Sequence, residues 1–436
     1  MPAEAKEVIF VISDFHLGEG VDSALEGFKH HPVGRRIKDT SGDYVLDRVF
    51  FAFIAHILET YANAKIRLKL LGDTFDPLSV KLGGKSVIIP YEEADLEKFR
   101  KIRRGHRTFF WALQYFCSRK NCTLEVHPGN HDMFLWWPQV QAEFVKNVSP
   151  RHPERVRFMH DELDRGIYFW HGNTEPHDRV NPKKTIIKVA DLPDFLKKEN
   201  MLGLFNKGKI PRKEIMDVTQ GHYLTAWLEN PLKEADYLIG RMHKHTFVWV
   251  DAAFRIFRRS WYRRRLFAFI AAYHLLKTLI LHSLSTLTFW HTKTKSDFRK
   301  ILRVVGWTIA GAIDGHTARD FAVKKLRDDD IDIVVLGHEH ERAAELHRFG
   351  NRDKWYFNTG TWLEMWEPRA LLQKKQWRRF RALQKIILFC AKFFRDADLV
   401  PINLFATLII AYDNEGRRTV RLKRFDPSSC ELTDIA

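Results

Sequence analysis

Short apolar runs that lead into polar residues recur along the chain and predict its strands. Runs of this length that are rich in Val, Ile and aromatic side chains are typical of strands buried in a sheet. We predict eight strands, at residues 8–13, 67–71, 123–127, 167–170, 332–336, 355–357, 405–412 and 419–424. Most of these runs end directly at polar residues, so polar side chains are expected at the strand ends.

Helical patterns lie between several of these runs. Residues 47–61 are amphipathic, residues 93–117 predict a long helix, and residues 317–326 predict a helix that precedes the run at Asp332. Strands that alternate with helices favour an α/β core with much parallel or mixed sheet. In such sheets the polar residues just beyond the strand ends form the ligand crevice, so we expect the functional residues there.

Two segments depart from this alternation. Residues 241–305 contain no Pro or Gly, and residues 363–397 contain no Gly; both combine many Arg and Lys with Trp, Phe and Leu. We interpret both as helical additions to the α/β core. The predicted core then comprises residues 1–240, 306–362 and 398–436, with a basic amphipathic insertion at 241–305 and a basic helical addition at 363–397.

The charge of the chain bears on its partners. The 436 residues carry a formal net charge of +17, and the sequence pI is near 9.6. A hydrophobic content of 45% supports a large buried core and argues against global disorder. A positive surplus of this size favours an anionic partner, either a phosphorylated substrate, an anionic lipid or a nucleic acid, and solubility alone is the alternative. The sequence indicates no protein partner.

Cysteine usage and hydropathy predict the compartment. The four cysteines, at positions 117, 122, 390 and 430, form neither a CxxC pair nor a disulfide framework, which favours reduced thiols. The chain enters an apolar run at once, without the pattern of an export signal. The most apolar stretch, residues 266–284, is interrupted by His274, Lys277 and His282, which favours lying on a membrane over crossing it. We therefore expect a cytoplasmic protein, with peripheral attachment to the cytoplasmic membrane as a further hypothesis.

Five short strings that follow apolar runs concentrate the candidate chemistry. They are SDFH at 13–16, GD at 72–73, GNHD at 129–132, HGN at 171–173 and GHEH at 337–340. Each is weak alone, because a lone His or Asp at a strand end is more often structural. Together they supply Asp, Asn and His without Cys, a ligand mixture that suits Mn, Fe or Zn and disfavours a thiolate site. Glycines beside these residues permit tight turns from strand to loop.

This ordered set resembles the calcineurin-like metallophosphoesterase superfamily, whose pattern runs DxH, GD, GNH[DE], H and GHxH. Every element is present in order between Asp14 and His340. The resemblance implies a four-layer α/β sandwich of two mixed sheets flanked by helices. It also implies an enzyme that hydrolyses a phosphoester or pyrophosphate bond. A catalytically silent scaffold of the same fold is the alternative.

The resemblance further implies a centre of two divalent metal ions. Its ligands would be Asp14, His16 and His340 for one ion, Asn130, His171 and His338 for the other, and Asp73 as the bridge between them. Mn is the expected working ion, with Fe, Zn or Mg as alternatives. Two ions roughly 3.5–4 Å apart can generate a hydroxide nucleophile near neutral pH and stabilise the attacking and leaving oxygens.

His131 and Asp76 are the predicted catalytic pair. In the family the His of GNH[DE] binds no metal; it contacts the phosphate and protonates the leaving group, a role that suits imidazole because its pKa lies near the working pH. Asp76 matches a position that pairs with this His in related phosphatases, and a turn carboxylate before Pro77 is the alternative. Residues 358–362 read NTGTW after a predicted strand. In the family, a similar Asn-Thr-Gly segment closes the sheet near the site. A plain turn after the strand explains these residues equally well.

Within the superfamily, SDFHLG, GDTFDP and GNHD look closest to the UDP-2,3-diacylglucosamine hydrolases, which cleave a lipid-linked nucleotide diphosphate at the membrane surface. The chain departs from that branch in having His131 where Arg is usual, HGN where HGD is usual, and a greater length. The basic, aromatic segments favour an anionic membrane surface. The alternatives are a nucleic-acid groove, with a soluble nucleotide or nucleic-acid phosphodiesterase activity, and a plain helical cap on the core.

Overall fold

A computed structural model of the chain describes residues 5–20, 34–35, 45–77, 80–83, 85–86, 92–159, 161–172, 186–187, 218–219, 318–340, 342–362, 364–368, 399–403 and 405–435. The chain divides into two compact units: unit 1 comprises Met1–Pro176, Ala318–Trp366 and Pro401–Ala436, and unit 2 comprises His177–Thr317 and Glu367–Val400. In unit 2 the described elements include a short antiparallel pair, β10 (Ile186–Ile187) and β11 (Val218–Thr219). All the metal ligands predicted from the sequence belong to unit 1.

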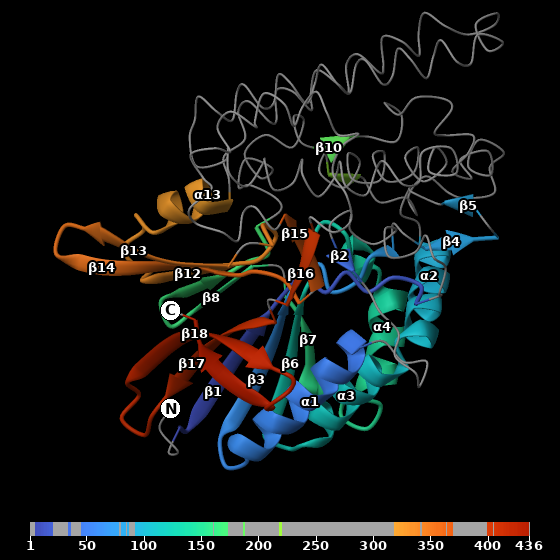
Figure 1. Ribbon diagram of the computed structural model, residues 1–436, viewed down its shortest axis with the longest axis horizontal. Coiled ribbons are helices and arrows are strands. Elements are labelled where there is room, and N and C mark those ends of the chain that lie inside the picture. The colour runs from blue at the N-terminus through green and yellow to red at the C-terminus, as the bar shows by residue number, and fades with distance from the viewer. Residues whose placement is uncertain are drawn as a thin grey trace, which may run out of the picture. The chain divides into compact units, whose positions relative to one another are not determined.

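A seven-stranded sheet runs through unit 1 in the order β19-β18-β17-β1-β3-β6-β7 (Figure 1). Its parallel strands are β1 (Glu7–Ile12), β3 (Lys65–Leu71), β6 (Cys122–His127) and β7 (Val156–Phe158). Antiparallel strands extend it beside β1, namely β17 (Ala406–Tyr412), β18 (Arg418–Asp426) and β19 (Glu431–Asp434). Every residue of β17 is buried. A strand that is covered on both faces in this way reads as a nearly continuous apolar run, which is the pattern found here.

A five-stranded sheet forms the second layer, in the order β13-β14-β12-β9-β8. Its parallel strands are β9 (Ile167–Phe169), β12 (Ile333–Leu336) and β14 (Arg352–Thr359). The antiparallel strands β8 (Glu162–Asp164) and β13 (Arg342–Phe349) lie at its edges. Both sheets are therefore mixed, and the predicted α/β class with two mixed sheets is confirmed.

One apolar core joins the two sheets. Its buried side chains come from β1 and β17 of the first sheet and from β9, β12 and β14 of the second, and they include Ile9, Val11, Leu408, Ile410, Ile167, Phe169, Ile333, Val335 and Phe357. The strands of both sheets approach this core from opposite sides. The core therefore fixes how the strand ends of one sheet lie against those of the other.

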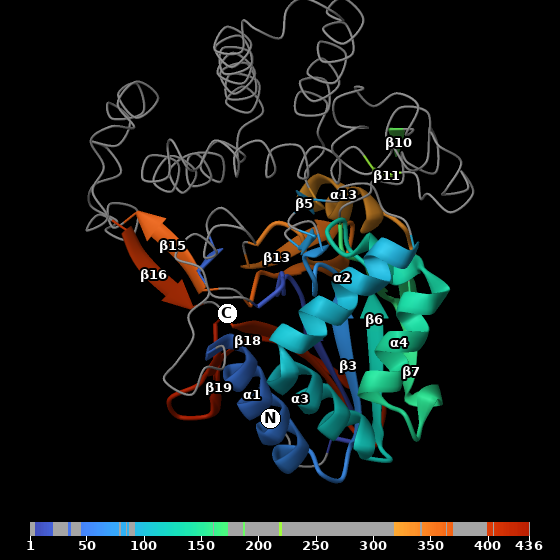
Figure 2. The same ribbon diagram turned by 90° about the vertical axis from the view of Figure 1, so that its right-hand side faces the viewer.

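Helices cover the outer faces of the sheets. Figures 1 and 2 show α1 (Val45–Thr60), α2 (Glu92–Gly105), α3 (Arg107–Ser118) and α4 (Pro138–Val148) along the seven-stranded sheet. Aromatic rings hold this layer together, as in the stack of Phe50 on Phe109 with ring centres 4.5 Å apart. On the second sheet, α13 (Ala318–Lys325) packs Phe321 against Trp170, with ring centres 4.7 Å apart.

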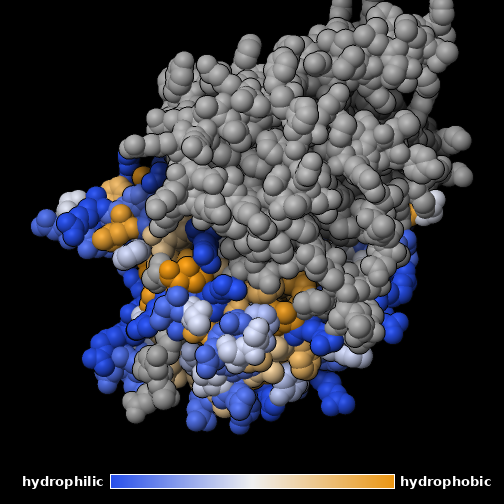
Figure 3. Space-filling model, viewed as in Figure 1, coloured by the Kyte–Doolittle hydropathy of each residue, from blue (hydrophilic) through white to orange (hydrophobic). Residues whose placement is uncertain are grey.

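Short elements complete the described structure. A three-stranded sheet has the order β16-β15-β2, from β16 (Leu399–Asn403), β15 (Glu364–Pro368) and β2 (Gly34–Arg35), and β4 (Lys81–Leu82) pairs with β5 (Lys85–Ser86). Single 3-10 turns occur at η3 (Met133–Trp136) and η4 (Pro153–Arg155). On the face drawn in Figure 3, the coloured surface is largely hydrophilic, with small hydrophobic areas between.

The long helix predicted at 93–117 is wrong, because the structure divides it into α2 and α3. Gly105 packs against the loop after β1, where a Cβ would lie 2.2 Å from the carbonyl oxygen of Glu19. His106 then leaves the helical region, with φ −123° and ψ 49°, and its Nδ1 contacts Asp47 at 2.9 Å. The helix breaks here because close packing and a buried polar contact outweigh the helical pattern.

The predicted helical addition at 241–305 lies outside the described residues and stays a prediction. Of the addition predicted at 363–397, residues 364–368 form strand β15 and are therefore not helical, because their backbone pairs with β2. The rest of that segment lies outside the described residues and stays a prediction, as do the predicted domain boundaries. Among the helices that the structure does describe, none combines the length and the apolar character needed to cross a membrane.

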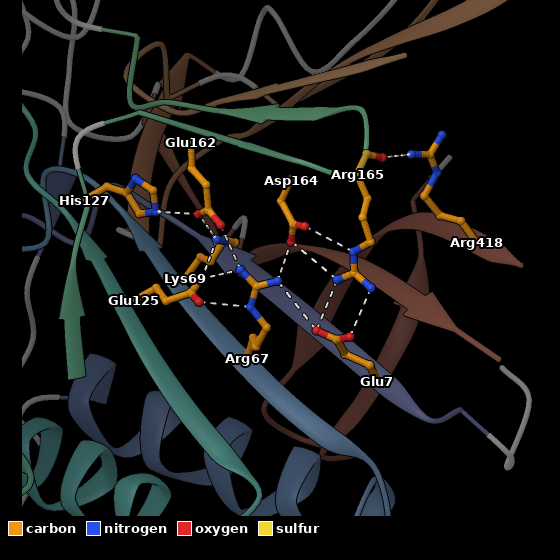
Figure 4. Close-up of polar contacts among 9 residues, drawn as sticks. All are labelled: Glu7, Arg67, Lys69, Glu125, His127, Glu162, Asp164, Arg165 and Arg418. Carbon is orange, nitrogen blue, oxygen red and sulfur yellow. Dashed lines mark hydrogen bonds and ion pairs between the residues drawn. The ribbon is translucent and has the colours of Figure 1, made fainter. Parts of the chain in front are cut away.

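Beside the apolar core, an ion network links β3 and β6 of the first sheet to β8 of the second (Figure 4). It comprises Glu7, Arg67, Lys69, Glu125, His127, Glu162, Asp164 and Arg165. Arg67 contacts Glu125 and Glu162, each at 2.9 Å, and also contacts Asp164. Lys69 is fully buried and pairs with the same two glutamates.

Candidate metal centre

The candidate ligands follow strand ends that meet at one edge of the two sheets. Asp14 and His16 follow β1, Asp73 follows β3, Asn130 and His131 follow β6, His171 follows β9, and His338 and His340 follow β12. Carboxyl ends of parallel strands share one edge of a sheet, and the common core sets the two edges together. As a result His16 and His340, which are 324 positions apart, have their Nε2 atoms 2.9 Å apart.

The backbone at this edge adopts an unusual conformation. Eight described residues other than Gly have a positive φ, and five of them are candidate ligands: Asp14, His16, Asp73, His338 and His340, with φ between 47° and 69°. Such a conformation costs on the order of 1–3 kcal/mol for each residue that has a Cβ, and it clusters at functional sites. Because five such residues lie at one edge and each costs stability, their backbone conformation indicates a functional site.

Asp14, His16 and His340 form the first group of potential ligands. One ligand atom from each lies within 4.8 Å of the others. The amide of His338 donates to Oδ2 of Asp14 at 3.1 Å, while Oδ1 lies 3.1 Å from Nε2 of His340. The amide of His16 donates to the carbonyl of Asp73 at 2.9 Å, which continues the pairing of β1 with β3 into their loops.

Asp73, His171 and His338 form the second group, with ligand atoms again within 4.8 Å of one another. Nδ1 of His171 donates to the carbonyl of Leu71 at 2.7 Å, which leaves Nε2 as the ligand atom, 3.1 Å from Oδ2 of Asp73. A Cβ on Gly72 would lie 2.3 Å from the His171 ring, so only Gly fits at this turn.

Asn130 lies buried beside this second group. Its neighbour Gly129 packs against Asp73 so closely that a Cβ would lie 2.2 Å from Oδ1 of that carboxylate. The structure therefore gathers six of the seven predicted ligands into these two groups, and it places the seventh, Asn130, between two residues whose backbones contact Asp73. The two groups follow the division between two ions that the family resemblance implies.

His131 was not among the predicted ligands, but the structure places it with His16 and Asp76 in a third group whose potential ligand atoms lie within 4.8 Å of one another. Its amide donates to Oδ1 of Asp73 at 2.8 Å, and its ring stands perpendicular to that of His16, with centres 4.5 Å apart. Nδ1 of His131 lies 3.3 Å from Oδ1 of Asp76, which is fully buried. The structure thus pairs Asp76 with His131. The alternative of a plain turn carboxylate at Asp76 does not account for this contact.

The carboxylates favour positive charge in their midst. Burial alone would raise the pKa of Asp14, but the imidazoles of His16 and His340 hold it well below its ordinary value. Burial lowers the pKa of His171, yet the charge of Asp73 outweighs it and raises the pKa to about 9. Burial and the neighbouring His171 lower the pKa of His338 to about 3. A buried anionic pair of this kind favours a bound cation, whether a proton or a metal ion.

The donor set fits a divalent metal ion. Among the described residues, Asp14 and Asp73 form ion pairs with His only and with no Lys or Arg. Oδ1 of Asp14 and Nε2 of His171 are buried and make no hydrogen bond, although a potential partner atom lies 3.1 Å from each. Lone pairs that converge without hydrogen bonds are the arrangement expected of metal ligands.

Sequence reasoning assigned no role to the residues that hold these loops in place. Asp132, the last residue of GNHD, accepts from the amides of Gly129 (2.5 Å), Thr74 (2.8 Å) and Phe75 (3.2 Å). These amides favour its carboxylate, while burial and the charge of Asp73 raise its pKa to about 7. Its place inside a recognised string was the available signal.

The NTGTW segment also contacts the ligand loops. Thr361 Oγ1 donates to the carbonyl of Asp14 at 2.6 Å, and Asn358 Nδ2 donates to the carbonyl of Gly337 at 2.7 Å. The segment is therefore more than a turn that ends β14. It packs where the loops after β1 and β12 meet.

A scan against protein-family models found no match for this chain, and a search of curated proteins found none either.

Proposed function

We propose that this chain is a metal-dependent hydrolase of a phosphoester or pyrophosphate bond, of the calcineurin-like metallophosphoesterase type. The observation that carries the proposal is the convergence of six Asp and His side chains at one edge of two sheets, five of them on backbone with a positive φ, with Asn130 buried beside them. Among the described residues, the two carboxylates of this set pair with His and not with Lys or Arg, which supports a site that takes up divalent metal ions.

The order of layers supports the same proposal. Helices α1 to α4, the seven-stranded sheet, the five-stranded sheet and α13 follow one another in unit 1, which agrees with the four-layer sandwich that the sequence resemblance implies. In the proposed centre Asp14, His16 and His340 hold one ion, Asn130, His171 and His338 hold the other, and Asp73 is shared. Mn is the proposed working ion, with Fe, Zn or Mg as alternatives.

His131 would handle the proton of the leaving group. Two divalent ions, when bound, would supply a nucleophile near neutral pH and neutralise charge on the phosphoryl oxygens. Asp76 holds Nδ1 of His131, so Nε2 is the atom left to meet the substrate and donate a proton to the leaving oxygen. The contact with Asp76 also fixes the orientation of the His131 ring.

Metal content and turnover test the proposal together. The purified full chain, loaded with Mn, should contain two ions per molecule and hydrolyse bis(p-nitrophenyl) phosphate, and a chelator should remove both properties. A chain that binds neither Mn, Fe, Zn nor Mg would overturn the proposal. A chain that binds two ions but turns over no phosphoester or pyrophosphate in a substrate panel would establish the alternative of a silent scaffold.

We further propose that the substrate is a lipid-linked phosphoester or pyrophosphate met at an anionic membrane surface. The support is sequence alone, namely the pairing of Arg and Lys with Trp, Phe and Leu in residues 241–305 and 363–397. Basic residues contribute roughly 1 kcal/mol each near an anionic surface, so binding should be peripheral and weakened by salt. A soluble nucleotide or nucleic-acid substrate is the alternative.

Flotation with anionic vesicles at low and high salt tests the membrane proposal. Replacing five arginines of one segment with Gln should weaken flotation while hydrolysis of a small soluble phosphodiester persists: Arg258, Arg259, Arg263, Arg264 and Arg265. No flotation at low salt would refute the membrane proposal. Tight binding to RNA or single-stranded DNA in its place would favour the nucleic-acid alternative.

A further inference from the structure

Two hydrogen-bonded clamps hold the loops of the candidate metal centre, and each touches a different part of it. The first clamp is Asp132, which is fully buried. Its Oδ2 accepts from the amides of Thr74 and Phe75, in the loop of Asp73, and its Oδ1 accepts from the amide of Gly129, in the loop of Asn130. One carboxylate therefore ties the loop after β3 to the loop after β6.

The second clamp is the pair Asn358 and Thr361, at the end of β14. Asn358 donates to the carbonyl of Gly337 at 2.7 Å, in the loop of His338 and His340, and accepts from the amide of Gly360 at 2.9 Å. Thr361 donates its hydroxyl to the carbonyl of Asp14 at 2.6 Å. This clamp therefore ties the loop after β12 to the loop after β1.

The clamps act where the backbone is strained. Asp73 beside the first clamp, and Asp14 beside the second, have φ of 50° and 59°. A residue in this region relaxes unless its surroundings over-determine it. Hydrogen bonds to the neighbouring peptide groups supply that constraint, because they fix the turn that aims the ligand side chain. Partners of this kind behind metal ligands typically matter by about 10- to 100-fold in metal affinity.

We propose that the two clamps divide the work between the two ions. Asp132 positions the loop of Asn130, for the ion held by Asn130, His171 and His338. In the second clamp, the Thr361 hydroxyl positions the loop of Asp14, for the ion held by Asp14, His16 and His340, while Asn358 holds the loop that carries both His338 and His340. This inference rests on the proposed metal centre. It adds two positioning elements, one selective for each ion.

Two substitutions remove the clamps with little change in shape. Asp132→Asn replaces one accepting oxygen with an NH₂ group, so at least one of the three amides meets a donor and loses its partner. Thr361→Val replaces the hydroxyl that binds the Asp14 carbonyl with a methyl group. Thr361→Ser keeps the hydroxyl and is the matched control.

Each ion is isolated by removing a ligand of the other. His340→Ala leaves the ion on the Asn130 side, and His338→Ala leaves the ion on the Asp14 side. In the His340→Ala chain, Asp132→Asn should weaken Mn binding by about 10- to 100-fold in calorimetry, and Thr361→Val should change it far less. In the His338→Ala chain the order should reverse, and Thr361→Ser should restore most of the affinity. Asp132→Asn should have a smaller effect here, through the shared Asp73.

The outcomes separate this inference from the proposed function. A parent chain that binds no Mn, Fe, Zn or Mg overturns the proposed function and the inference with it. Suppose instead that the parent chain binds two ions. If each clamp variant then weakens the binding of both ions equally, or weakens the binding of neither ion, the inference alone is overturned. Thermal unfolding in chelator controls for folding, because a purely structural role would lower stability without changing the ratio of the two affinities.

Discussion

Two buried polar regions of unit 1 handle charge in opposite ways. In the ion network, the described acids have Arg or Lys partners, and Lys69 lies between Glu125 and Glu162 (Figure 4). At the candidate metal centre, the partners of Asp14 and Asp73 among the described residues are imidazoles, and the buried atoms Oδ1 of Asp14 and Nε2 of His171 make no hydrogen bond. The acids of the first region therefore have cationic partners within the protein. For the second region, we propose that a bound cation supplies the missing partner.

This difference predicts where mutations act. In a buried ion network each charge has a partner of opposite sign. Removing one member leaves its partners as buried charges without compensation, which destabilises the fold. A strained, incompletely paired site contributes function and detracts from stability. Substitutions at the centre should therefore reduce chemistry, and substitutions in the network should reduce stability.

The largest expected effect is on turnover, in Asp73→Asn. The change removes the charge of the shared ligand, so we expect turnover to fall by roughly 10⁴, equivalent to about 5.5 kcal/mol, with loss of bound Mn. The amide oxygen can still accept from the amide of His131, and Asn tolerates a positive φ. The free energy of unfolding in chelator should therefore change by less than about 1 kcal/mol. Wild-type turnover in this variant would refute the two-ion assignment.

His131→Gln should separate chemistry from metal binding. We expect two ions to remain, since His131 is assigned as no ligand, while turnover falls by roughly 10²–10⁴, the usual range for a lost general acid or base. Metal analysis and steady-state kinetics on the same sample decide the matter. If the metal content fell in step with activity, His131 would belong among the ligands.

Glu125→Ala tests the opposite region. Arg67 and Lys69 would be left in a buried site with one carboxylate fewer, which should destabilise the fold by about 3–5 kcal/mol in urea unfolding. Turnover of the folded fraction at low temperature should stay near that of the parent. The exposed pair of Arg348 with Asp353 (3.0 Å) is the control, and Arg348→Ala should cost at most about 1 kcal/mol. If Glu125→Ala and Arg348→Ala lowered the free energy of unfolding by equal amounts, the network would contribute no more to stability than an exposed ion pair.

Acid should reduce the stability that the ion network contributes through Glu125. Burial alone would raise the pKa of Glu125, but Lys69 and Arg67 outweigh it and hold the pKa below its ordinary 4.5. The folded state then binds fewer protons than the unfolded state, so this stability is complete above about pH 4.5 and is lost as the pH falls through the lowered value. The slope of unfolding free energy against pH should be shallower in Glu125→Gln. An unchanged slope would exclude Glu125 as its source.

The strands were predictable from sequence where the chain carries a short run rich in apolar residues. All eight predicted strands are present, within a few residues, as β1, β3, β6, β9, β12, β14, β17 and β18. Strand β8 was missed because its inward side chains, Glu162 and Asp164, are charges paired with Arg67 and Lys69. A hydrophobic pattern cannot reveal a strand whose buried face is ionic.

The sequence predicted which residues make up the candidate site, but not the contacts that hold them in place. The strings named its ligands because they carry unusual side chains at strand ends. The role of Asp132 stayed hidden, since it rests on contacts with backbone amides, which no side-chain pattern encodes. The buried contact of His106 with Asp47 was missed for a related reason, because a lone His among charged residues is typical of a surface.

Each group of ligands draws on both sheets, and this sets a timetable for biosynthesis. Asp14 and His16 follow β1, whereas their companion His340 follows β12, near the far end of the chain. A ribosome adds roughly 5–20 residues per second, so tens of seconds separate the first ligand from the last. During that interval the nascent chain carries Asp14 and His16 without His340. Only a chain extended beyond His340 can assemble the Asp14 group, so this part of the proposed centre forms late in synthesis.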